Sequence, residues 1–177
     1  MSTTTAGTRE SHSELSPPTD LSPEDVQAVT EAINPLVADA FALYVKTKNF
    51  HWHLSGRRFR DLHLLFDEQA EGLFESVDVL AERVRKIGGQ TIRSISQISE
   101  LQTIRDDNDD FVAPHEMVRR LCDDNRHLTE VQRKAHERCT QTGDVATTSI
   151  LEDLIDETER RTWFLFEMSR STDGEAH

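Results

Sequence analysis

Residues 58–86 read RFRDLHLLFDEQAEGLFESVDVLAERVRK, and this stretch decides the fold. It contains no proline, and the pair Gly88-Gly89 that follows is typical of a helix end, so we predict one helix over its whole length. Glycine and proline are scarce in the chain, with 7 and 5 of 177 residues, which favours helices over a β-sandwich. The stretch therefore predicts an all-α protein built from long helices.

The residues before this stretch predict a second long helix over 22–53. Ser22 suits the N-cap, Pro23 suits the first helical position, and Asp25 completes a pattern like a capping box. Apolar residues then recur with helical period at Val26, Val29, Ile33, Leu36, Val37, Phe41 and Tyr44. The break at 54–56 is short, so the two helices are expected to be antiparallel neighbours.

The second half of the chain predicts another helical pair. A helix begins near Pro114 and ends at 140–143, and its stripe is Met117, Leu121, Leu128, Val131 and Ala135. Asp144 then caps a fourth helix with the stripe Leu151, Leu154, Ile155, Thr158, Thr162 and Leu165. The connection 90–113 is long enough to run the length of a helix, and its isoleucines and Leu101 favour a short helix within it.

Four long helices with one long crossover between the second and third are ferritin-like connectivity. We assign residues 22–170 to a single ferritin-like four-helix bundle. Residues 1–21 are rich in Thr, Ser, Glu and Pro without periodicity, which predicts a disordered tail. Residues 171–177 form a short acidic tail.

The composition excludes several classes of protein. The net charge of −13 does not favour binding to nucleic acid or anionic lipid, whereas it attracts cations. The two cysteines, Cys122 and Cys139, form no CxxC motif, so neither a disulfide scaffold nor a cysteine-based zinc site is expected. We find no stretch of membrane-span length and no apolar leader, so a soluble, cytoplasmic protein with no membrane partner is expected.

Ligand-type side chains line one face of the 58–86 helix. His63 and Asp67 are four residues apart, as are Asp78 and Glu82, so each pair shares a face. Asp78 follows Asp67 by eleven residues, which returns to within about 20° of the same direction but lies roughly 16 Å along the axis. Since metal–ligand bonds are about 2 Å long, the two pairs of one chain cannot bind the same ion.

A second copy of the helix would complete such a site. If it packs antiparallel across a two-fold axis, 63/67 of one chain meets 78/82 of the other, giving two equivalent sites per dimer. The centre of the pairing lies between Gly72 and Leu73, and Gly72 would allow close approach of the backbones. His51, at the end of the preceding helix, is a candidate fifth ligand.

Structural alternatives exist for each of these residues. An i,i+4 pair on a charged helix is usually a solvated face, and Glu82 could simply pair with Lys86. His51 beside Trp52 could be a packed aromatic residue, and His53 is better explained as structural. A conventional di-iron bundle uses Glu-x-x-His on two helices, and no histidine here has that pattern. The closest match is Asp124-x-x-His127, and we interpret these two as polar residues at the surface or between packed helices.

Several segments together resemble the Dps family of mini-ferritins, over about residues 22–170. They are KNFHWHLSG at 48–56, then Phe59, Leu62-His63, Phe66-Asp67, Asp78, Ala81-Glu82-Arg83 and Ile87-Gly88-Gly89, with 143–147 and Trp163 in the same style. The resemblance implies a hollow dodecamer of two-fold dimers. That cage oxidises Fe(II), preferably with hydrogen peroxide rather than O2, and stores ferric mineral inside. It also implies a ferroxidase site at the two-fold interface that takes two iron ions, with ligands His51, His63, Asp67, Asp78 and Glu82.

Two further roles follow from the chemistry of this set. Imidazole and carboxylate together suit Fe(II), and Zn(II) is expected to compete for the same ligands because it outranks Fe(II) in affinity. Trp52, next to His51, is a candidate electron donor or radical sink, with packing as its alternative.

The resemblance also implies pores, lined by acids near the start of the last helix, that admit iron. Asp144 and Asp153 match these positions, whereas Ser149 stands where an acid is frequent, and Asp144 could equally be only a helix cap. Some members bind DNA through a basic tail, but residues 1–21 hold one arginine against three acids, so we expect no direct DNA binding. Two alternatives to the ferroxidase remain: a nucleoid-associated DNA-binding stress protein with little ferroxidase activity, and a metal-free structural bundle.

Overall fold

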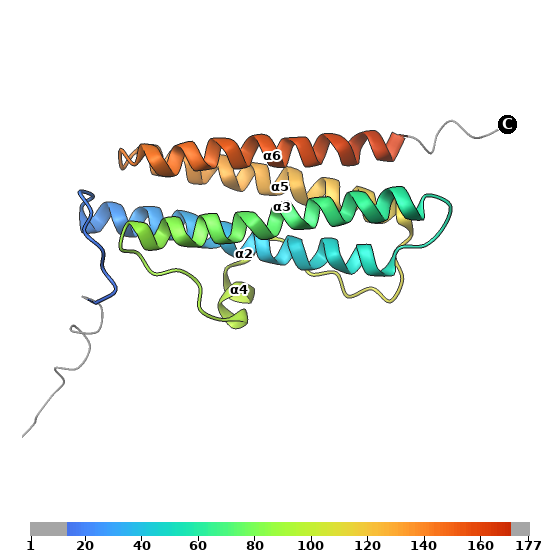
Figure 1. Cartoon of the computed structure of the whole chain (residues 1–177), viewed down its shortest axis with the longest axis horizontal. Coiled ribbons are helices and arrows are strands. Elements are labelled where there is room, and N and C mark those ends of the chain that lie inside the picture. Colours follow the sequence, from blue (N-terminus) through green and yellow to red (C-terminus); the bar gives the residue numbers. More distant parts are fainter. Residues whose placement is uncertain (1–13, 171–177) are drawn as a thin grey trace, which may run out of the picture.

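A computed structural model describes residues 14–170, and within this range it contains helices and no strand (Figure 1). The predicted all-α, ferritin-like architecture is confirmed. The helices are α2 (Pro23–His53), α3 (Phe59–Lys86), α4 (Ile95–Leu101), α5 (Pro114–Thr140) and α6 (Val145–Arg170). The acidic tail predicted at 171–177, and most of the tail predicted at 1–21, lie outside the described residues.

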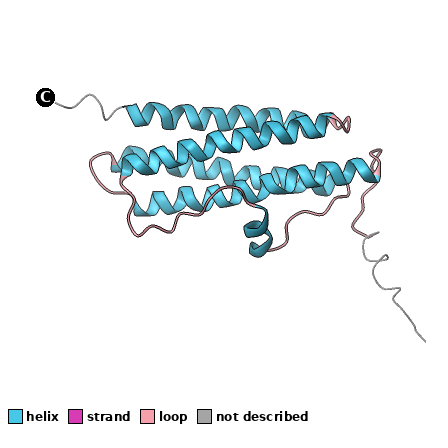
Figure 2. Cartoon of the chain, turned by 180° about the vertical axis from the view of Figure 1, so that it is seen from behind, coloured by secondary structure: helices cyan, strands magenta, loops and turns pink. Residues whose placement is uncertain are grey.

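The four long helices form two antiparallel pairs, α2 with α3 and α5 with α6 (Figure 1). Helix α2 also packs against α5, whereas α3 and α6 barely touch. The crossover between α3 and α5 runs over the outside of the bundle and carries α4, which lies against α2 (Figure 2). The topology therefore has the single long crossover that the loop lengths predict.

The helix ends follow the predicted signals. Ser22 caps α2, because its side-chain oxygen accepts a hydrogen bond from the backbone N–H of Asp25 at 3.1 Å. After α3, Gly88 adopts a φ of +88°, a left-handed conformation in which other residues are strained. Gly143 does the same before α6, with a φ of +72°. These glycines set the turns that begin the crossover and join the second pair of helices.

The core follows the predicted stripes for the most part, although Val26, Val131 and Thr162 are only partly buried. Val29, Ile33, Leu36, Leu121, Leu128, Leu151 and Leu165 are fully buried. Phe41 and Tyr44, which the periodicity assigns to the same stripe, are only partly buried. Tyr44 packs against the core and its ring lies 5.1 Å from that of Phe74 on α3, whereas Phe41 lines a hollow that α2 forms with the crossover.

Polar side chains of the bundle hold the crossover in place. Asp39, which is fully buried, accepts hydrogen bonds from the Thr103 hydroxyl at 2.8 Å and from the Ile104 backbone at 3.0 Å. The same Thr103 oxygen lies 2.7 Å from His127 Nε2 on α5. The crossover is thereby fixed between α2 and α5.

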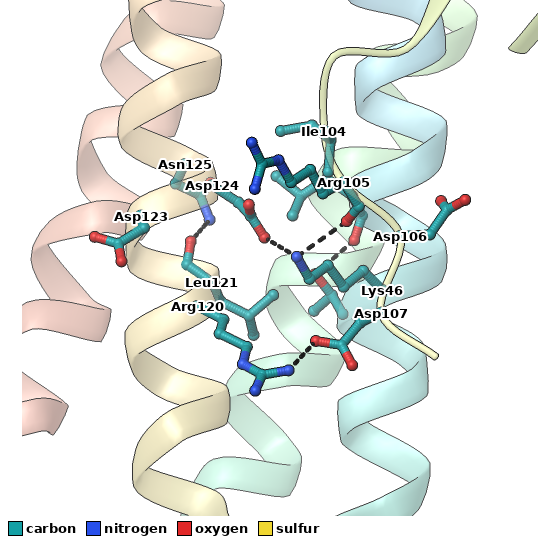
Figure 3. A network of polar contacts seen from close by, with 12 residues as sticks. Lys46, Ile104, Arg105, Asp106, Asp107, Arg120, Leu121, Asp123, Asp124 and Asn125 are labelled. Atoms are coloured by element: carbon teal, nitrogen blue, oxygen red, sulfur yellow. Dashed lines mark hydrogen bonds and ion pairs between the residues drawn. The ribbon is translucent and has the colours of Figure 1, made fainter. Parts of the chain in front are cut away.

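A buried ion pair lies beside this contact. Figure 3 shows Lys46 of α2 reaching both the carbonyl of Arg105, at 3.1 Å, and the carboxylate of Asp124 on α5, at 2.7 Å. Burial raises the pKa of Asp124, and Lys46 opposes that rise. Asp124 and His127 therefore serve in packing, as the missing Glu-x-x-His pattern predicts.

The expectation that no segment reaches membrane-span length is wrong for one helix. By length and composition alone, α2 is long and apolar enough to cross a membrane. A core helix passes the same criterion, and the buried residues of α2 pack against α3 and α5 inside the bundle.

Candidate metal centre

His51 and His63 face each other across the short turn between α2 and α3. Their rings are stacked, with centroids 3.7 Å apart. His51 Nδ1 lies 2.9 Å from the carbonyl of His63, and His63 Nδ1 lies 3.1 Å from the carbonyl of His51. Because a carbonyl can only accept, Nδ1 is the donor in each ring, and in the neutral imidazole this tautomer leaves the lone pair on Nε2. This reciprocal arrangement fixes the orientation of both imidazoles, as is typical of metal-binding histidines.

Asp67 lies one turn after His63 and approaches the same place. Its Oδ1 is 3.9 Å from His51 Nε2 and 2.6 Å from Lys48 Nζ. The hydrogen bond from Lys48 lowers the pKa of Asp67 below the ordinary aspartate value, which keeps the carboxylate ionised at neutral pH. Two nitrogen donors and one carboxylate are therefore gathered at this end of α3.

Asp78 and Glu82 lie further along α3 and are exposed. Glu82 pairs with Lys86 at 3.0 Å, which is the structural alternative considered for it. In the part of the chain that the structure describes, no group of three or more His, Cys, Asp or Glu side chains is arranged to hold a metal ion. One chain thus presents two separate partial sets, and the five-ligand site itself stays a prediction.

The two residues that flank Trp52 differ in their surroundings. His51 is 8% exposed and its ring is stacked on that of His63, so it is a packed aromatic residue whose Nε2 can still serve as a ligand. His53 is exposed, and its Nδ1 lies 2.8 Å from the Asn49 carbonyl one turn earlier, away from the imidazole pair. Trp52 itself is 64% exposed, so core packing does not explain it.

Asp144 makes both a hydrogen bond and an ion pair at the start of α6. It is 5% exposed, accepts a hydrogen bond from the Thr147 backbone at 3.1 Å, and pairs with Arg83 of α3 at 2.6 Å. Burial by itself would raise the pKa of Asp144, but the hydrogen bonds from Arg83 and Thr147 outweigh it and lower the pKa. The helix-cap interpretation therefore describes its contacts. Asp153, by contrast, is exposed on α6, and the pore role of both acids stays a prediction.

The suggested role of Gly72 in pairing with a second subunit stays a prediction. Within the chain a Cβ added there would meet nothing within 4 Å, so no contact inside the bundle requires a glycine. The residue lines a groove together with Glu68 and Glu75 of α3 and Arg160 of α6.

Sequence reasoning missed Lys48 as a neighbour of the site. Lys48 and His51 are three residues apart on α2, so they share a face, and that spacing was the available signal. What the sequence lacks is the relative rotation of α2 and α3, which determines that Lys48 meets Asp67 rather than solvent.

Comparisons with known proteins agree with the ferritin-like fold. Residues 30–172 match the ferritin-like domain family. A low temperature-induced protein of Nostoc is 36% identical over 146 residues, covering 82% of each chain. The DNA protection during starvation protein of Brevibacillus brevis is 32% identical over 139 residues, covering 78% of this chain and 93% of that protein.

Solved structures are similar over most of the chain. DpsC from Streptomyces coelicolor superposes with a TM-score of 0.83 at 27% identity, covering 85% of this chain and 88% of that one. The Dps protein of Vibrio cholerae gives a TM-score of 0.81 at 27% identity, covering 87% and 96%. That protein is described as a member of a broad superfamily of ferritin-like diiron-carboxylate proteins.

Proposed function

This chain belongs to the Dps branch of the ferritin-like domain family, and on that premise we propose that it oxidises Fe(II) and stores the product as ferric mineral inside a cage of its own copies. The cage is a dodecamer of two-fold dimers, and the protein acts in the cytoplasm. Iron is the substrate and cargo of this reaction.

The observation that carries the proposal is the division of the ligands into two incomplete sets. His51 of α2 lies beside His63 and Asp67 at one end of the stripe, while Asp78 and Glu82 lie about three and four turns after Asp67 on α3. An antiparallel copy of α3 brings the second set to the first, because the spacing from 63 to 67 equals that from 78 to 82. Each dimer then holds two sites with five ligands each.

The donor set fits the reaction. Two imidazole nitrogens with carboxylate oxygens suit Fe(II), and in this proposal Glu82 would bridge two ions. Two ferrous ions lose one electron each, and these electrons with two protons convert one hydrogen peroxide into two water molecules. Holding both ions together avoids the one-electron step that releases hydroxyl radical. The family resemblance implies that hydrogen peroxide is the preferred oxidant, with O2 less effective.

The remaining residues have supporting roles. The reciprocal hydrogen bonds of His51 and His63 fix the orientation of both rings and favour the tautomer in which Nε2 is the nitrogen that would bind the metal. Trp52, exposed beside the site, supplies an electron or traps a radical if only one ferrous ion is present. Zn(II) binds the same ligands and blocks oxidation. Asp153, with Asp144, contributes to a negative pore that draws Fe²⁺ inward.

The relatives named for DNA protection raise a second function, direct binding to the nucleoid. The charge of this chain, −13, opposes it, since phosphate binding needs exposed Lys and Arg. Protection of DNA would then come from removing iron and peroxide. A gel-shift assay at moderate salt without divalent cations tests this, and retarded DNA would favour the nucleoid role.

The proposed function is tested by the variants His63→Ala and Asp67→Ala. Each is expected to slow peroxide-dependent Fe(II) oxidation strongly while the assembly keeps its mass, because both side chains are partly exposed and support no core packing. A control, Asp123→Ala, changes an exposed acid on α5 and should keep the wild-type rate. Wild-type oxidation by both site variants would refute the site.

A further inference from the structure

The imidazole of His63 lies between two other rings. Its centroid is 3.7 Å from that of His51 and 4.9 Å from that of Phe59, with interplanar angles of 20° and 23°. A nearly parallel ring at 3.7 Å leaves no room for another ring on the same face, so the Phe59 ring covers the opposite face. Both faces of the His63 imidazole are therefore covered by an aromatic ring.

This stacking restricts the one torsion that decides where the His63 nitrogens point. Nδ1 lies 3.1 Å from the carbonyl of His51, and Nε2 is the nitrogen that would bind the metal. The χ2 torsion of a histidine has broad minima, so the side chain by itself resists rotation of the ring only weakly. Rotation would break the Nδ1 hydrogen bond and turn Nε2 to another direction. A ring held between two parallel rings resists this rotation, because its edges would meet both neighbours.

Phe59 is more exposed than core packing would leave it. It is the first residue of α3 and is 44% exposed, whereas Leu62, one turn later, is 3% exposed and part of the core. Phe59 and His63 are four residues apart, so their side chains are neighbours on the helix surface. The contact with His63 therefore gives this large, half-exposed ring a role that the core does not.

The backbone that carries Phe59 is itself fixed. Gly56 adopts a φ of +97°, where other residues are strained, and its carbonyl accepts a hydrogen bond from the backbone N–H of Phe59 at 3.1 Å. The guanidinium of Arg58 donates to the carbonyl of Met168 on α6 at 2.9 Å. The first turn of α3 is thereby tied to the end of α6, so the Phe59 ring meets His63 from a rigid support.

We propose that Phe59 is a positioning residue for the metal site, whose ring holds the His63 imidazole with Nε2 in the direction of the metal. The proposal rests on the proposed function, because it assumes that His63 is a ligand. Phe59 has no donor atom and acts only through His63. A hydrogen bond to the second ring nitrogen commonly orients a metal-binding histidine, and the Phe59 ring reinforces that bond here.

The test measures Zn(II) binding to the metal-free protein by calorimetry. Phe59→Leu removes the ring but keeps an apolar side chain, and its affinity should fall about three- to tenfold, the range of one aromatic contact. Phe59→Tyr keeps the ring and should bind as tightly as the wild type. Phe166→Leu is the matched control, since Phe166 is a 48% exposed phenylalanine on α6, and it should leave the affinity unchanged. Wild-type affinity in Phe59→Leu, or an equal loss in Phe59→Tyr, overturns the proposal.

A spectroscopic measurement separates positioning from a general loss of stability. Co(II) bound in place of iron absorbs visible light, and the position and intensity of its bands depend on the arrangement of the ligands. At saturating Co(II), the spectrum of Phe59→Leu should differ from that of the wild type, and Phe59→Tyr should restore the wild-type spectrum. A wild-type spectrum from Phe59→Leu would overturn the proposal even if its affinity were lower.

Two controls make every outcome decisive. Circular dichroism reports whether the helices are intact, and if Phe59→Leu loses helix content, Phe59→Ala carries the test with the same expected results. His63→Ala is measured in parallel. Wild-type Zn(II) affinity in His63→Ala would sink the metal site of the proposed function. Lost binding in His63→Ala, together with wild-type affinity and spectrum in Phe59→Leu, would leave the metal site standing and sink only the role of Phe59.

Discussion

Lys48 Nζ lies 2.6 Å from Asp67 Oδ1, so the chain supplies its own cation to a carboxylate that is proposed to bind iron. The ammonium lowers the pKa of Asp67 and directs its carboxylate toward α2, on the side of the stacked imidazoles. The ligand is thus ionised and oriented before any metal arrives. A divalent ion that takes this carboxylate must displace or share the lysine contact.

Removing that lysine is expected to tighten metal binding. In Lys48→Met a metal ion no longer has to break the ion pair between Lys48 and Asp67 in order to bind the carboxylate. Zn(II) affinity measured by calorimetry should therefore rise about two- to five-fold, which corresponds to the free energy of a partly exposed ion pair. Lys134→Met, which changes an exposed lysine on α5, is the control and should leave the affinity unchanged. Equal or weaker binding by Lys48→Met would show that the lysine does not compete with metal.

The cap of α6 should contribute measurably to stability. Asp144→Ala removes a helix cap and leaves Arg83 without its partner, so urea unfolding at neutral pH should show a loss of about 1–2 kcal/mol. Asp144→Ser restores the cap without the ion pair and should recover part of that loss.

The same residue predicts a pH dependence with a definite sign. Because the pKa of Asp144 is lowered in the folded protein, its stabilisation is present above the ordinary aspartate value near ~3.9 and is lost as pH falls through the lower, folded value. The unfolding free energies of wild type and Asp144→Ala should therefore converge in acid. A difference that stays constant down to that range would mean that the carboxylate charge is not responsible.

The buried pair of Lys46 and Asp124 should behave differently from a surface salt bridge. Lys46→Met leaves the Asp124 carboxylate uncompensated beneath the crossover, which should destabilise the fold by about 3–5 kcal/mol at neutral pH. Burial raises the pKa of Asp124, so the loss should shrink in acid, where the carboxyl group is neutral. The double variant Lys46→Met/Asp124→Leu should recover most of the stability. A double variant as unstable as Lys46→Met alone would contradict this explanation.

Most of the fold could be predicted from local sequence signals. Ser22 and Gly88 mark helix ends through backbone chemistry that acts within a few residues, so the structure has helices where these signals indicate them. Loop lengths then restrict the topology to one long crossover. The extent of the core was misjudged, for example at Phe41 and Tyr44, since periodicity shows which face is apolar and not what covers it.

The candidate site could be predicted less fully, for a related reason. Helical spacing identifies side chains that share a face of α3, and the ligand stripe depends on nothing else. The position of Lys48 beside Asp67 depends on how α2 is rotated against α3, which neither helix encodes alone. For Gly72 the structure shows only that no contact inside the bundle requires a glycine, so its suggested role in helix pairing between subunits stays a prediction.

The most direct measurement is complementation between two inactive variants. His63→Ala and Glu82→Ala chains are unfolded together, refolded as an equal mixture and assayed for Fe(II) oxidation with peroxide. If each site takes ligands from two subunits, every mixed dimer contains one intact site, so random pairing should restore about one quarter of the wild-type sites. Activity that stays at the level of the separate variants would mean that one chain builds its own site, and would contradict the shared metal centre.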